Sequence, residues 1–364
     1  MRRVGLLFGG RSVEHEVSVV SARGVAAAMA GSAETTCVPL AVTADGRWLS
    51  PETSRRILDG DAGRVVADPE DAARISIVPG AGFARVNDDG TGEPLEIDVL
   101  FPLIHGWGGE DGRLQGGLEL AGVPYVGAGV TGSAVAMDKV FSRRLFEERG
   151  LPVCDWIAAD RIELQRDRDA VVARIKKQLD FPVFVKPANG GSSLGVVKAT
   201  REGDLERALA TAARFDRRLV VERGHDVREI ECAVLGNEVP EASVLGEIVP
   251  SNDFYDFDAK YVDAASELII PAALPPALAE RIRTLACEAY RTLDLVGFAR
   301  VDFFVGRENE EVWLNEVNTL PGFTSISMFP KLWDASGLPY TRLIERLVDL
   351  AVEADRGVPP TPEE

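Results

Sequence analysis

The chain has 364 residues and a mass of 39.3 kDa, more than one ordinary hydrophobic core uses, so we expect two or three packed units. Hydrophobic residues make up 46% and charged residues 27%, a globular balance that excludes a disordered or fibrous protein. The formal net charge of −18 argues against a sequence-independent nucleic-acid binder, although a few well-placed cations can still hold a small anionic ligand.

The four cysteines lie far apart and form no C-x-x-C pair, so the sequence predicts neither a zinc site nor a dense disulfide framework. The first apolar run is too short for a signal peptide. Later apolar runs do not approach the roughly 18 residues that a membrane span needs. We therefore expect a cytoplasmic protein with no membrane partner.

Strand-like and helix-like patterns alternate in the first 127 residues. Residues 4–8 form a short apolar run that ends at two glycines, and residues 17–29 follow with helical spacing. Residues 36–42 and 97–104 predict two more strands, and the second of these is apolar enough to be buried on both faces. Strands that alternate with helices imply a parallel sheet with right-handed crossovers.

Residues 44–94 interrupt this alternation. They contain Asp-Gly, Pro-Gly and Asn-Asp-Asp-Gly turn signals and only short strand-like pieces, such as residues 75–78. We interpret the segment as an irregular elaboration, so the first unit spans residues 1–127 with an insertion at 44–94.

Two further α/β units are predicted. Residues 128–222 contain expected helices at 133–148, 164–179 and 204–215 and expected strands at 153–158, 182–186, 196–199 and 219–222. Residues 223–364 contain the alternating segment REIECAVLG, a helix at 277–293, strands at 298–305 and 311–317, and a last helix at 342–353. The sequence thus predicts three α/β units in a row.

A loop rich in glycine and serine follows a strand of the second unit. The segment KPANGGSSLG begins with Lys186, and Gly190 and Gly191 have no Cβ atom to keep a ligand from the backbone. Successive N–H groups of such a loop, with the hydroxyls of Ser192 and Ser193, can hold a phosphate. The loop has neither a P-loop nor a G-x-G-x-x-G motif, and a plain surface turn fits the same residues.

Polar side chains interrupt two apolar strands of the third unit. Arg300 and Asp302 point to one side of the segment RVDFFV, and Glu316 and Asn318 share a side of WLNEVN. Adjacent strands of this kind bring carboxylate and amide oxygens together, and such oxygens favour Mg²⁺ or Mn²⁺. A solvated polar face is the alternative, but buried acids without a cation would be costly, so we favour a metal site.

Two loops follow strands of the first sheet, at the edge where ligands of open α/β sheets collect. In GGRSVEHEVS, Glu16 could neutralise an ammonium group, while Glu14 and His15 fit a solvated helix start. In HGWGGEDG, His105 lies between an apolar strand and a glycine-rich turn, which favours a binding role over a place in the core.

Residues 254–261, FYDFDAKY, combine aromatic, acidic and lysine side chains with weak periodicity. Aromatic side chains are costly to leave exposed in a long loop, so the segment is typical of a lid that buries them over a ligand. A crossover packed permanently on the core is the alternative.

These motifs, in this order and from the Gly9 loop to Met328, resemble those of D-alanine:D-alanine ligases of the ATP-grasp superfamily. The resemblance implies a three-domain ATP-grasp fold with an N-terminal parallel-sheet domain, and a cytoplasmic homodimer. It also implies an enzyme that joins two D-alanines for peptidoglycan precursors. In that reaction one D-alanine carboxylate attacks the γ-phosphorus of ATP, and the amine of the second D-alanine then displaces phosphate from the acyl phosphate.

The resemblance also implies roles for the nucleotide-binding residues. Those that match the family's ATP site are Lys139, Lys186, Ser193, Glu222, Arg223, Glu229 and Lys260. Those that match the ligands of two Mg²⁺ ions, for which Mn²⁺ can substitute, are Asp302, Glu316 and Asn318.

On the substrate side, the family pattern implies that Glu16 anchors the ammonium of the first D-alanine in a hydrogen-bonded group with Ser192 and Tyr261. The remaining matches are His105 beside the substrates, Arg300 and the N–H of Gly322 as oxyanion stabilisers, and Ser327 with Met328 as the wall for the second D-alanine. The motifs single out no general base.

The chain departs from compact members of the family in two places. The insertion at 44–94 lengthens the first unit, and Arg223 stands where some members carry lysine. The complete FYDFDAKY motif favours an amine over D-lactate as acceptor. D-serine stays open as the second substrate, since a hydroxyl group discriminates weakly. A nucleotide-binding regulator without turnover is disfavoured, because Arg300, Asp302, Glu316 and Asn318 are all present.

Overall fold

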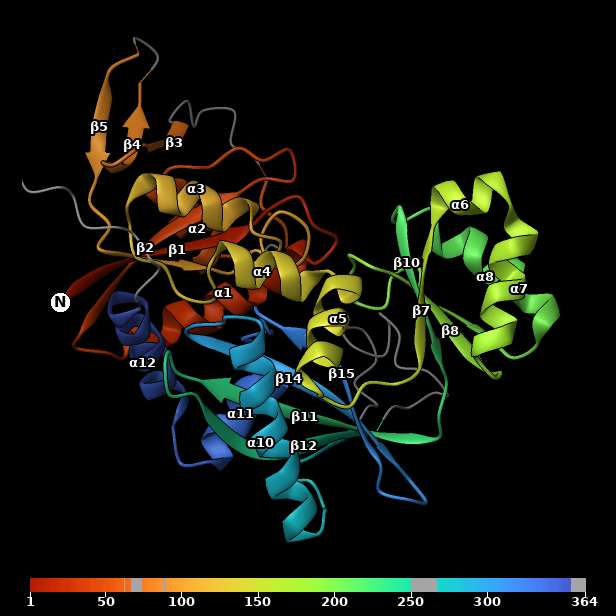
Figure 1. Cartoon of the computed structure of the whole chain (residues 1–364). Helices are drawn as coiled ribbons and strands as arrows, with labels where there is room; N and C mark the ends of the chain where they lie inside the picture. Colours follow the sequence, from red (N-terminus) through yellow and green to blue (C-terminus); the bar gives the residue numbers. More distant parts are fainter. Residues whose placement is uncertain (62, 67–73, 88–89, 250–266, 355–364) are drawn as a thin grey trace, which may run out of the picture.

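A computed structural model describes residues 1–61, 63–66, 74–87, 90–249 and 267–354 (Figure 1). The amino-terminal unit is built on a parallel sheet of order β2-β1-β6, formed by β1 (Arg2–Gly9), β2 (Thr35–Val42) and β6 (Val99–Pro102). The expected alternation of strand and helix is confirmed here, because β1 leads through a glycine turn into α1 (His15–Ala30).

A buried serine fixes the start of α1 against the sheet. The Oγ atom of Ser18 accepts a hydrogen bond from the N–H of Gly9 at 2.7 Å and donates to the carbonyl of Leu103 at 2.5 Å. Val19, Ala22 and Val25 continue the buried stripe of the helix. The loops that follow β1 and β6 therefore lie together at the carboxyl edge of the sheet.

The insertion at 44–94 is more regular than the sequence suggests. It contains α2 (Pro51–Asp59), whose first turn is capped by the Oγ atom of Ser50, and a separate antiparallel sheet. That sheet consists of β3 (Arg74–Val78), β4 (Gly82–Val86) and β5 (Gly92–Leu95), and it packs on α3 (Arg113–Ala121). Turn signals between strands of four or five residues hid this sheet from the periodicity.

The second unit carries an antiparallel sheet of order β7-β10-β8-β9. Its strands are β7 (Trp156–Asp160), β8 (Val183–Pro187), β9 (Val197–Ala199) and β10 (Arg218–Arg223). Its helices are α6 (Arg161–Arg166), α7 (Arg168–Gln178) and α8 (Glu202–Ala212), and with the sheet they form the lobe on the right of Figure 1.

The helix expected at 133–148 is divided in two at Asp138. α4 (Val130–Met137) ends there, and α5 (Lys139–Arg149) begins with the Asp138 carboxylate accepting from the N–H groups of Val140 at 3.0 Å and Phe141 at 3.2 Å. Asp138 also forms a β-bridge with Asn189. The capping carboxylate ends one helix and starts the next, which the apolar spacing does not reveal.

The third unit contains an antiparallel sheet of order β13-β12-β11-β14-β15. Its strands are β11 (Val227–Leu235), β12 (Glu241–Val249), β13 (Glu267–Ile269), β14 (Phe298–Gly306) and β15 (Val312–Asn318). The sequence analysis identified β11, β14 and β15 but missed β12 and β13. Successive residues of β11 face opposite sides of the sheet. Cys232 packs in a core with residues of α10 (Pro276–Thr292), and Ala233 packs in the core that includes residues of the first unit.

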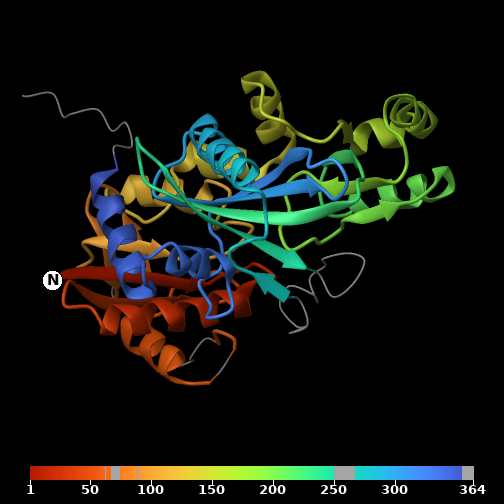
Figure 2. The same ribbon diagram turned by 90° about the horizontal axis from the view of Figure 1, so that it is seen from below.

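One hydrophobic core crosses from the first unit to the third. Phe323, which is fully buried, lies with its ring centroid 5.6 Å from those of Phe101, Phe298 and Phe329. The last two helices, α11 (Met328–Ala335) and α12 (Tyr340–Glu353), belong to this core, and α12 contacts α1 and β6 (Figure 2). The carboxyl-terminal helices therefore pack on the amino-terminal unit. The domain boundaries at 1–127, 128–222 and 223–364 stay predictions.

Among the helices that the structure describes, none is both long enough and apolar enough to cross a membrane.

Leu347→Ala in α12 should lower the free energy of unfolding by about 2–5 kcal/mol, because it leaves a cavity in the core shared by the first and third units. Leu347 is fully buried, whereas Val352 in the same helix is 47% exposed. Urea denaturation followed by circular dichroism measures the change. Val352→Ala is the matched control and should stay within about 0.5 kcal/mol of the parent. Equal effects of the two substitutions would contradict the shared core.

Candidate functional site

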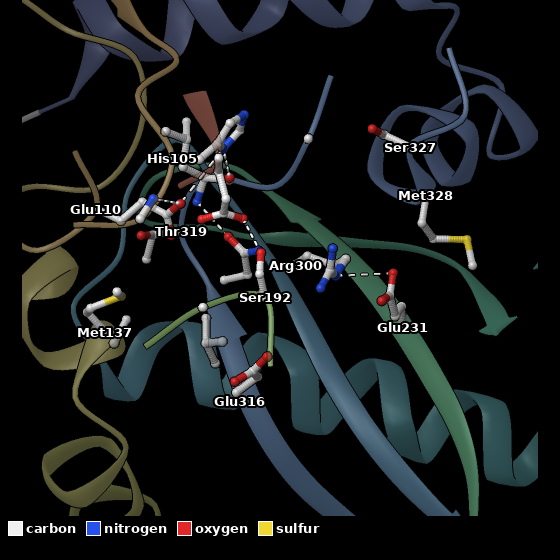
Figure 3. Close-up of a pocket in the computed structure, with 18 of the residues that line it drawn as sticks. His105, Glu110, Met137, Ser192, Glu231, Arg300, Glu316, Thr319, Ser327 and Met328 are labelled. Carbon is white, nitrogen blue, oxygen red and sulfur yellow. Dashed lines mark hydrogen bonds and ion pairs between the residues drawn. The ribbon is translucent and has the colours of Figure 1, made fainter. Parts of the chain in front are cut away.

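All three units contribute residues to one cavity of about 160 Å³ (Figure 3). The first unit provides Glu14, His105 and Glu110, the second provides the loop at 190–192, and the third provides Arg300, Glu316, Asn318 and the segment around Gly322. The structure therefore brings together most of the residues that the sequence analysis proposed from separate motifs.

The loop at 190–195 has a strained backbone beside this cavity. Ser192 and Ser193 have φ values of 50° and 56°, in the left-handed region that side chains other than glycine adopt rarely. The N–H of Lys139 donates to the carbonyl of Ala188 at 3.0 Å, and the Nζ atom of Lys139 donates to the carbonyl of Gly190 at 2.8 Å. The start of α5 thus holds the loop in place.

The acidic side chain that meets this loop is Glu14 and not Glu16. The Oγ atom of Ser192 donates to Oε1 of Glu14 at 2.6 Å, and Glu14 is only 8% exposed. The side chain of Glu16 is 58% exposed and pairs with Arg64, with its Oε1 atom 2.6 Å from Nε. The hydrogen-bonded group predicted for Glu16 is therefore wrong for that residue.

Helix geometry explains why Glu14 and Glu16 have different surroundings. Two residues along a helix correspond to a rotation of roughly 200°, so Glu14 and Glu16 face opposite directions at the start of α1. The buried stripe at Ser18 and Ala22 runs back toward Glu14, whereas Glu16 lies in line with Val20, which is 45% exposed. The spacing shows that the two acids face apart, but only packing decides which of them meets Ser192. His15, also 8% exposed, is buried as well, so the solvated helix start is not observed.

His105 and Glu110 form a buried acid–imidazole pair under the cavity. Nδ1 of His105 lies 2.9 Å from the carbonyl oxygen of Leu320 and 3.8 Å from Oε1 of Glu110, which accepts from the N–H of Gly106 at 2.8 Å. Burial by itself lowers the pKa of His105, but Glu110, Glu14 and the Leu320 carbonyl together raise it above its ordinary value. Burial, with the nearby Glu14, also raises the pKa of Glu110.

Arg300 lies between two carboxylates. Its Nε and Nη2 atoms donate to Oδ1 and Oδ2 of Asp302 at 2.7 and 2.6 Å, and Nε is 3.1 Å from Oε2 of Glu231. Burial acts to lower the pKa of Arg300, but Asp302, Glu231 and Glu316 raise it well above its ordinary value. The guanidinium group is therefore a permanent cation in the wall of the cavity.

Asp302 and Glu316 are register partners on β14 and β15, and Asn318 lies opposite Arg300 in the same ladder. Both carboxylates currently face cations, since Oε2 of Glu316 is 3.1 Å from Nζ of Lys139. Within the described residues, no group of three His, Cys, Asp or Glu side chains is placed to hold a metal ion. The set of two carboxylates and one amide nevertheless consists only of the oxygen donors that Mg²⁺ accepts.

The segment after β15 forms another wall of the cavity. Gly322, Ser327 and Met328 all line it, and Figure 3 places Ser327 and Met328 on the side of Arg300 and Glu231. A Cβ atom on Gly322 would lie 2.7 Å from the Oγ atom of Ser327, so a larger residue there would displace the Ser327 side chain. The Oγ atom of Ser327 accepts from the N–H of Thr324 at 3.1 Å, which closes this turn.

A second cavity, of about 80 Å³, adjoins the first and shares with it the residues Lys139, Glu316 and the loop at 190–192. It is also lined by Lys186, Ser193 and Glu229, three of the residues predicted to bind nucleotide. Cations and a glycine-serine loop in a shared wall make this cavity suitable for phosphate groups.

Two predicted nucleotide contacts differ from expectation. The Glu222 carboxylate is 2% exposed and pairs with Arg143 and Lys186, so only its backbone is left for a nucleotide. Arg223 does not line the second cavity, and its Nη1 and Nη2 atoms lie 3.9 and 3.7 Å from carboxylate oxygens of Asp155 and Asp180. Both side chains already have acidic or basic partners in the structure.

Lys260, Tyr261 and the whole predicted lid at 254–261 lie outside the described residues.

The sequence analysis missed several residues of the first cavity. Glu110 and Glu231 are the chemically important ones, together with the apolar or hydroxyl residues Met137, Ile248, Leu268, Thr319, Thr324 and Ile326. Glu110 was within the segment HGWGGEDG and could have been suspected as a partner for His105. Glu231 could not, because it comes near Arg300 only through the pairing of β11 with β14.

Two antiparallel α/β units thus share a pair of adjoining cavities that contain cations, a phosphate-type loop and acidic oxygens, and a parallel-sheet unit closes one end. This arrangement defines an ATP-grasp protein with an amino-terminal parallel-sheet domain, as the sequence predicts.

Comparison with known proteins identifies the family. Residues 3–128 match the family model described as D-ala D-ala ligase N-terminus, and residues 145–349 match the D-ala D-ala ligase C-terminus. The D-alanine–D-alanine ligase of Acetivibrio thermocellus is 45% identical, over 97% of this chain and 96% of its own length. D-alanine–D-alanine ligase A of Escherichia coli K12 is also 45% identical, over 96% of both chains. The chain belongs to the D-alanine–D-alanine ligase family.

Solved structures agree with this assignment. The D-alanine-D-alanine ligase from Coxiella burnetii superposes with a TM-score of 0.82 at 35% identity, covering 97% of this chain and 94% of its own. The VanG D-Ala:D-Ser ligase from Enterococcus faecalis gives a TM-score of 0.83 at 30% identity, covering 96% of this chain and 99% of its own.

The pKa of His105 should lie above its ordinary value of 6.5, and Glu110→Gln should lower it, because the substitution removes the largest influence that raises it. The chain has three histidines, so NMR titration of the imidazole signals, with His105→Gln to assign the signal, measures both values. Glu16→Gln, on the solvent side of α1, is the control and should leave the His105 signal unchanged. A His105 pKa that does not respond to Glu110→Gln would contradict the pairing.

Proposed function

We propose that this protein is an ATP-dependent ligase that joins two D-alanines into D-alanyl-D-alanine, for peptidoglycan precursor synthesis. The observation that carries the proposal is a single cavity in which a buried carboxylate, a permanent guanidinium and a phosphate-type loop surround one small space. The relatives at about 45% identity over nearly the whole chain bear the name of this activity.

The chemistry requires activation of a carboxylate. A free carboxylate is a poor acyl donor, and transfer of the γ-phosphoryl group of ATP supplies a leaving group. The protein contributes mainly positioning and neutralisation of charge in such a transfer. Lys139, Lys186 and the loop at Ser193 supply cations and N–H donors in the walls of the second cavity, next to the substrate cavity.

Divalent metal fits the same place. Asp302, Glu316 and Asn318 would hold Mg²⁺, with Mn²⁺ as a substitute and two ions as the proposed number. The metal would neutralise phosphate charge when bound. Lys139 and Arg300 pair with the two carboxylates in the structure, and the two acids lie opposite each other on β14 and β15.

On the substrate side, Glu14 takes the role that the resemblance assigned to Glu16. A buried carboxylate that already accepts from Ser192 has further oxygen lone pairs for the ammonium of the first D-alanine. Tyr261 stays a prediction as the third member of this group. His105 lines the same cavity together with Glu14 and Glu110.

Arg300 and the N–H of Gly322 are proposed to stabilise the tetrahedral oxyanion. Asp302 and Glu231 hold Nε and Nη2 of Arg300, which fixes the plane of the guanidinium group in advance. Ser327 and Met328 then form the wall for the carboxylate and methyl group of the second D-alanine, since both line the cavity on the side of Arg300.

D-serine is the alternative second substrate, supported by the similarity to the VanG D-Ala:D-Ser ligase. The higher identity to D-alanine–D-alanine ligases favours D-alanine. A silent regulator is disfavoured, because Arg300 and Glu316 line one cavity and Asp302 pairs with Arg300. A cytoplasmic location, where ATP is available, and a homodimeric state complete the proposal.

The purified chain with ATP, Mg²⁺ and D-alanine should release phosphate and form a product with the mass of D-alanyl-D-alanine. Parallel reactions with D-serine or D-lactate added to D-alanine, read by mass spectrometry, determine the acceptor. A mixed D-alanyl-D-serine product in excess would favour the alternative. The absence of both phosphate and dipeptide with D-alanine would refute the proposal.

Glu14→Gln should raise KM for D-alanine about tenfold to a hundredfold, because it removes a charged hydrogen-bond acceptor worth about 1.5–3 kcal/mol from a buried site. Steady-state kinetics with varied D-alanine measure this change. Glu16→Gln is the matched control, two residues away but exposed, and should leave KM within about twofold of the parent. A larger effect at Glu16 than at Glu14 would restore the assignment made from the sequence.

A further inference from the structure

A fully buried arginine lies behind the second cavity. Arg143, on α5, is 1% exposed and pairs through Nη2 with Oε2 of Glu222 on β10. The other oxygen of the same carboxylate, Oε1, pairs with Nζ of Lys186 on β8. One carboxylate thus joins two cations, and only Lys186 among the three lines the second cavity.

Packing alone does not favour an arginine at this buried position. Among the described residues, its Nε and Nη1 atoms have no hydrogen-bond partner, and the ring of Trp156 lies 6.0 Å from Cζ. Buried donors without acceptors destabilise a fold, and a buried ion pair can often be replaced by apolar side chains without loss of stability. A role other than stability accounts for a cation at this position.

The balance of charge among Arg143, Glu222 and Lys186 indicates that role. Glu222 paired with Lys186 alone would be neutral, so Lys186 would offer little net charge to an anion. With Arg143 added, two positive groups share one negative group, and the cluster carries a charge of about +1 next to the second cavity. Burial acts to raise the pKa of Glu222, but Lys186 and Arg143 together hold it below its ordinary value, so the carboxylate stays ionised between them.

Two further side chains beside the Lys186 ammonium are uncharged. The Oδ1 atom of Asn315 lies 3.4 Å from Nζ of Lys186, and the ring of Phe304 is 5.7 Å from the same Nζ. The carboxylates of Glu229 and Glu316 also line the second cavity, where Glu316 pairs with Lys139. Cys154 is a neutral thiol, because burial and Glu222 raise its pKa to about 12. Asp155 is 70% exposed and faces Arg223, in solvent that screens its charge.

We propose that Arg143 is a positioning residue for nucleotide binding: by sharing the Glu222 carboxylate, it leaves the Lys186 ammonium net positive toward a phosphate group. The inference rests on the proposed use of ATP and goes beyond it, since Arg143 does not line either cavity and acts only through Glu222. The class of ligand is a nucleoside di- or triphosphate.

The test measures binding of ADP with Mg²⁺ to the full-length protein by calorimetry, in the absence of D-alanine. Arg143→Met should weaken ADP binding about tenfold, and Arg143→Lys, which keeps the charge, should stay within about threefold of the parent. Arg144→Met is the matched control, because Arg144 is the exposed neighbour on the same helix and loses the same formal charge. In steady-state assays, Arg143→Met should raise KM for ATP and leave KM for D-alanine unchanged.

The double variant Arg143→Met/Glu222→Gln separates charge from packing. It removes one positive and one negative group, so the cluster returns to about +1, and ADP binding should recover to within about threefold of the parent. This variant also decides the question if Arg143→Met alone does not fold, since it contains no buried carboxylate oxygen that has lost its cation. Parental affinity in Arg143→Met, or weak binding in a folded double variant, would overturn the proposal.

These outcomes are distinct from failure of the proposed function. A parent protein that binds ADP but releases no phosphate with D-alanine would refute the ligase and leave the role of Arg143 open to the same binding test. A parent that makes D-alanyl-D-alanine, with equal ADP affinity in Arg143→Met, would refute only the role of Arg143.

Discussion

The structure depends on one buried carboxylate at the junction of two helices. Asp138, which is 2% exposed, caps α5, accepts from Nδ2 of Asn189 at 3.0 Å and pairs with Arg218. These contacts tie the start of α5 to the loop at 190–195 and to β10. Because Lys139 follows directly, the same junction fixes a cation between the two cavities, and Arg143 one turn later reaches Glu222.

Paired charges explain how a protein with a net charge of −18 can provide a site for phosphate. Three acids near the cavities have cationic partners within the fold: Arg300 for Asp302, Lys139 for Glu316, and both Arg143 and Lys186 for Glu222. The excess of acids is therefore mostly a property of the surface, where salt screens it over roughly 8 Å. The local balance of charge, and not the net charge, decides what the cavities accept.

Much of the fold could be predicted, because its central strands are apolar and its helices are amphipathic. The sequence did not reveal some elements, for physical reasons. β4 and β5 have five and four residues, too few for a clear period, and the edge strand β13 has three. The break at Asp138 comes from a cap and a β-bridge to a residue about 50 positions away, which no local pattern contains.

The sequence by itself determined many of the central strands and helices, the phosphate-type loop and the oxygen donors on β14 and β15, because these follow from local spacing. Only the tertiary structure decided that Glu14 and not Glu16 meets Ser192, that Glu231 stands beside Arg300, and that Arg143 shares the carboxylate of Glu222. Each of these contacts joins elements that are distant along the chain. Strand pairing and packing between distant elements, rather than residue spacing, set which side chains meet.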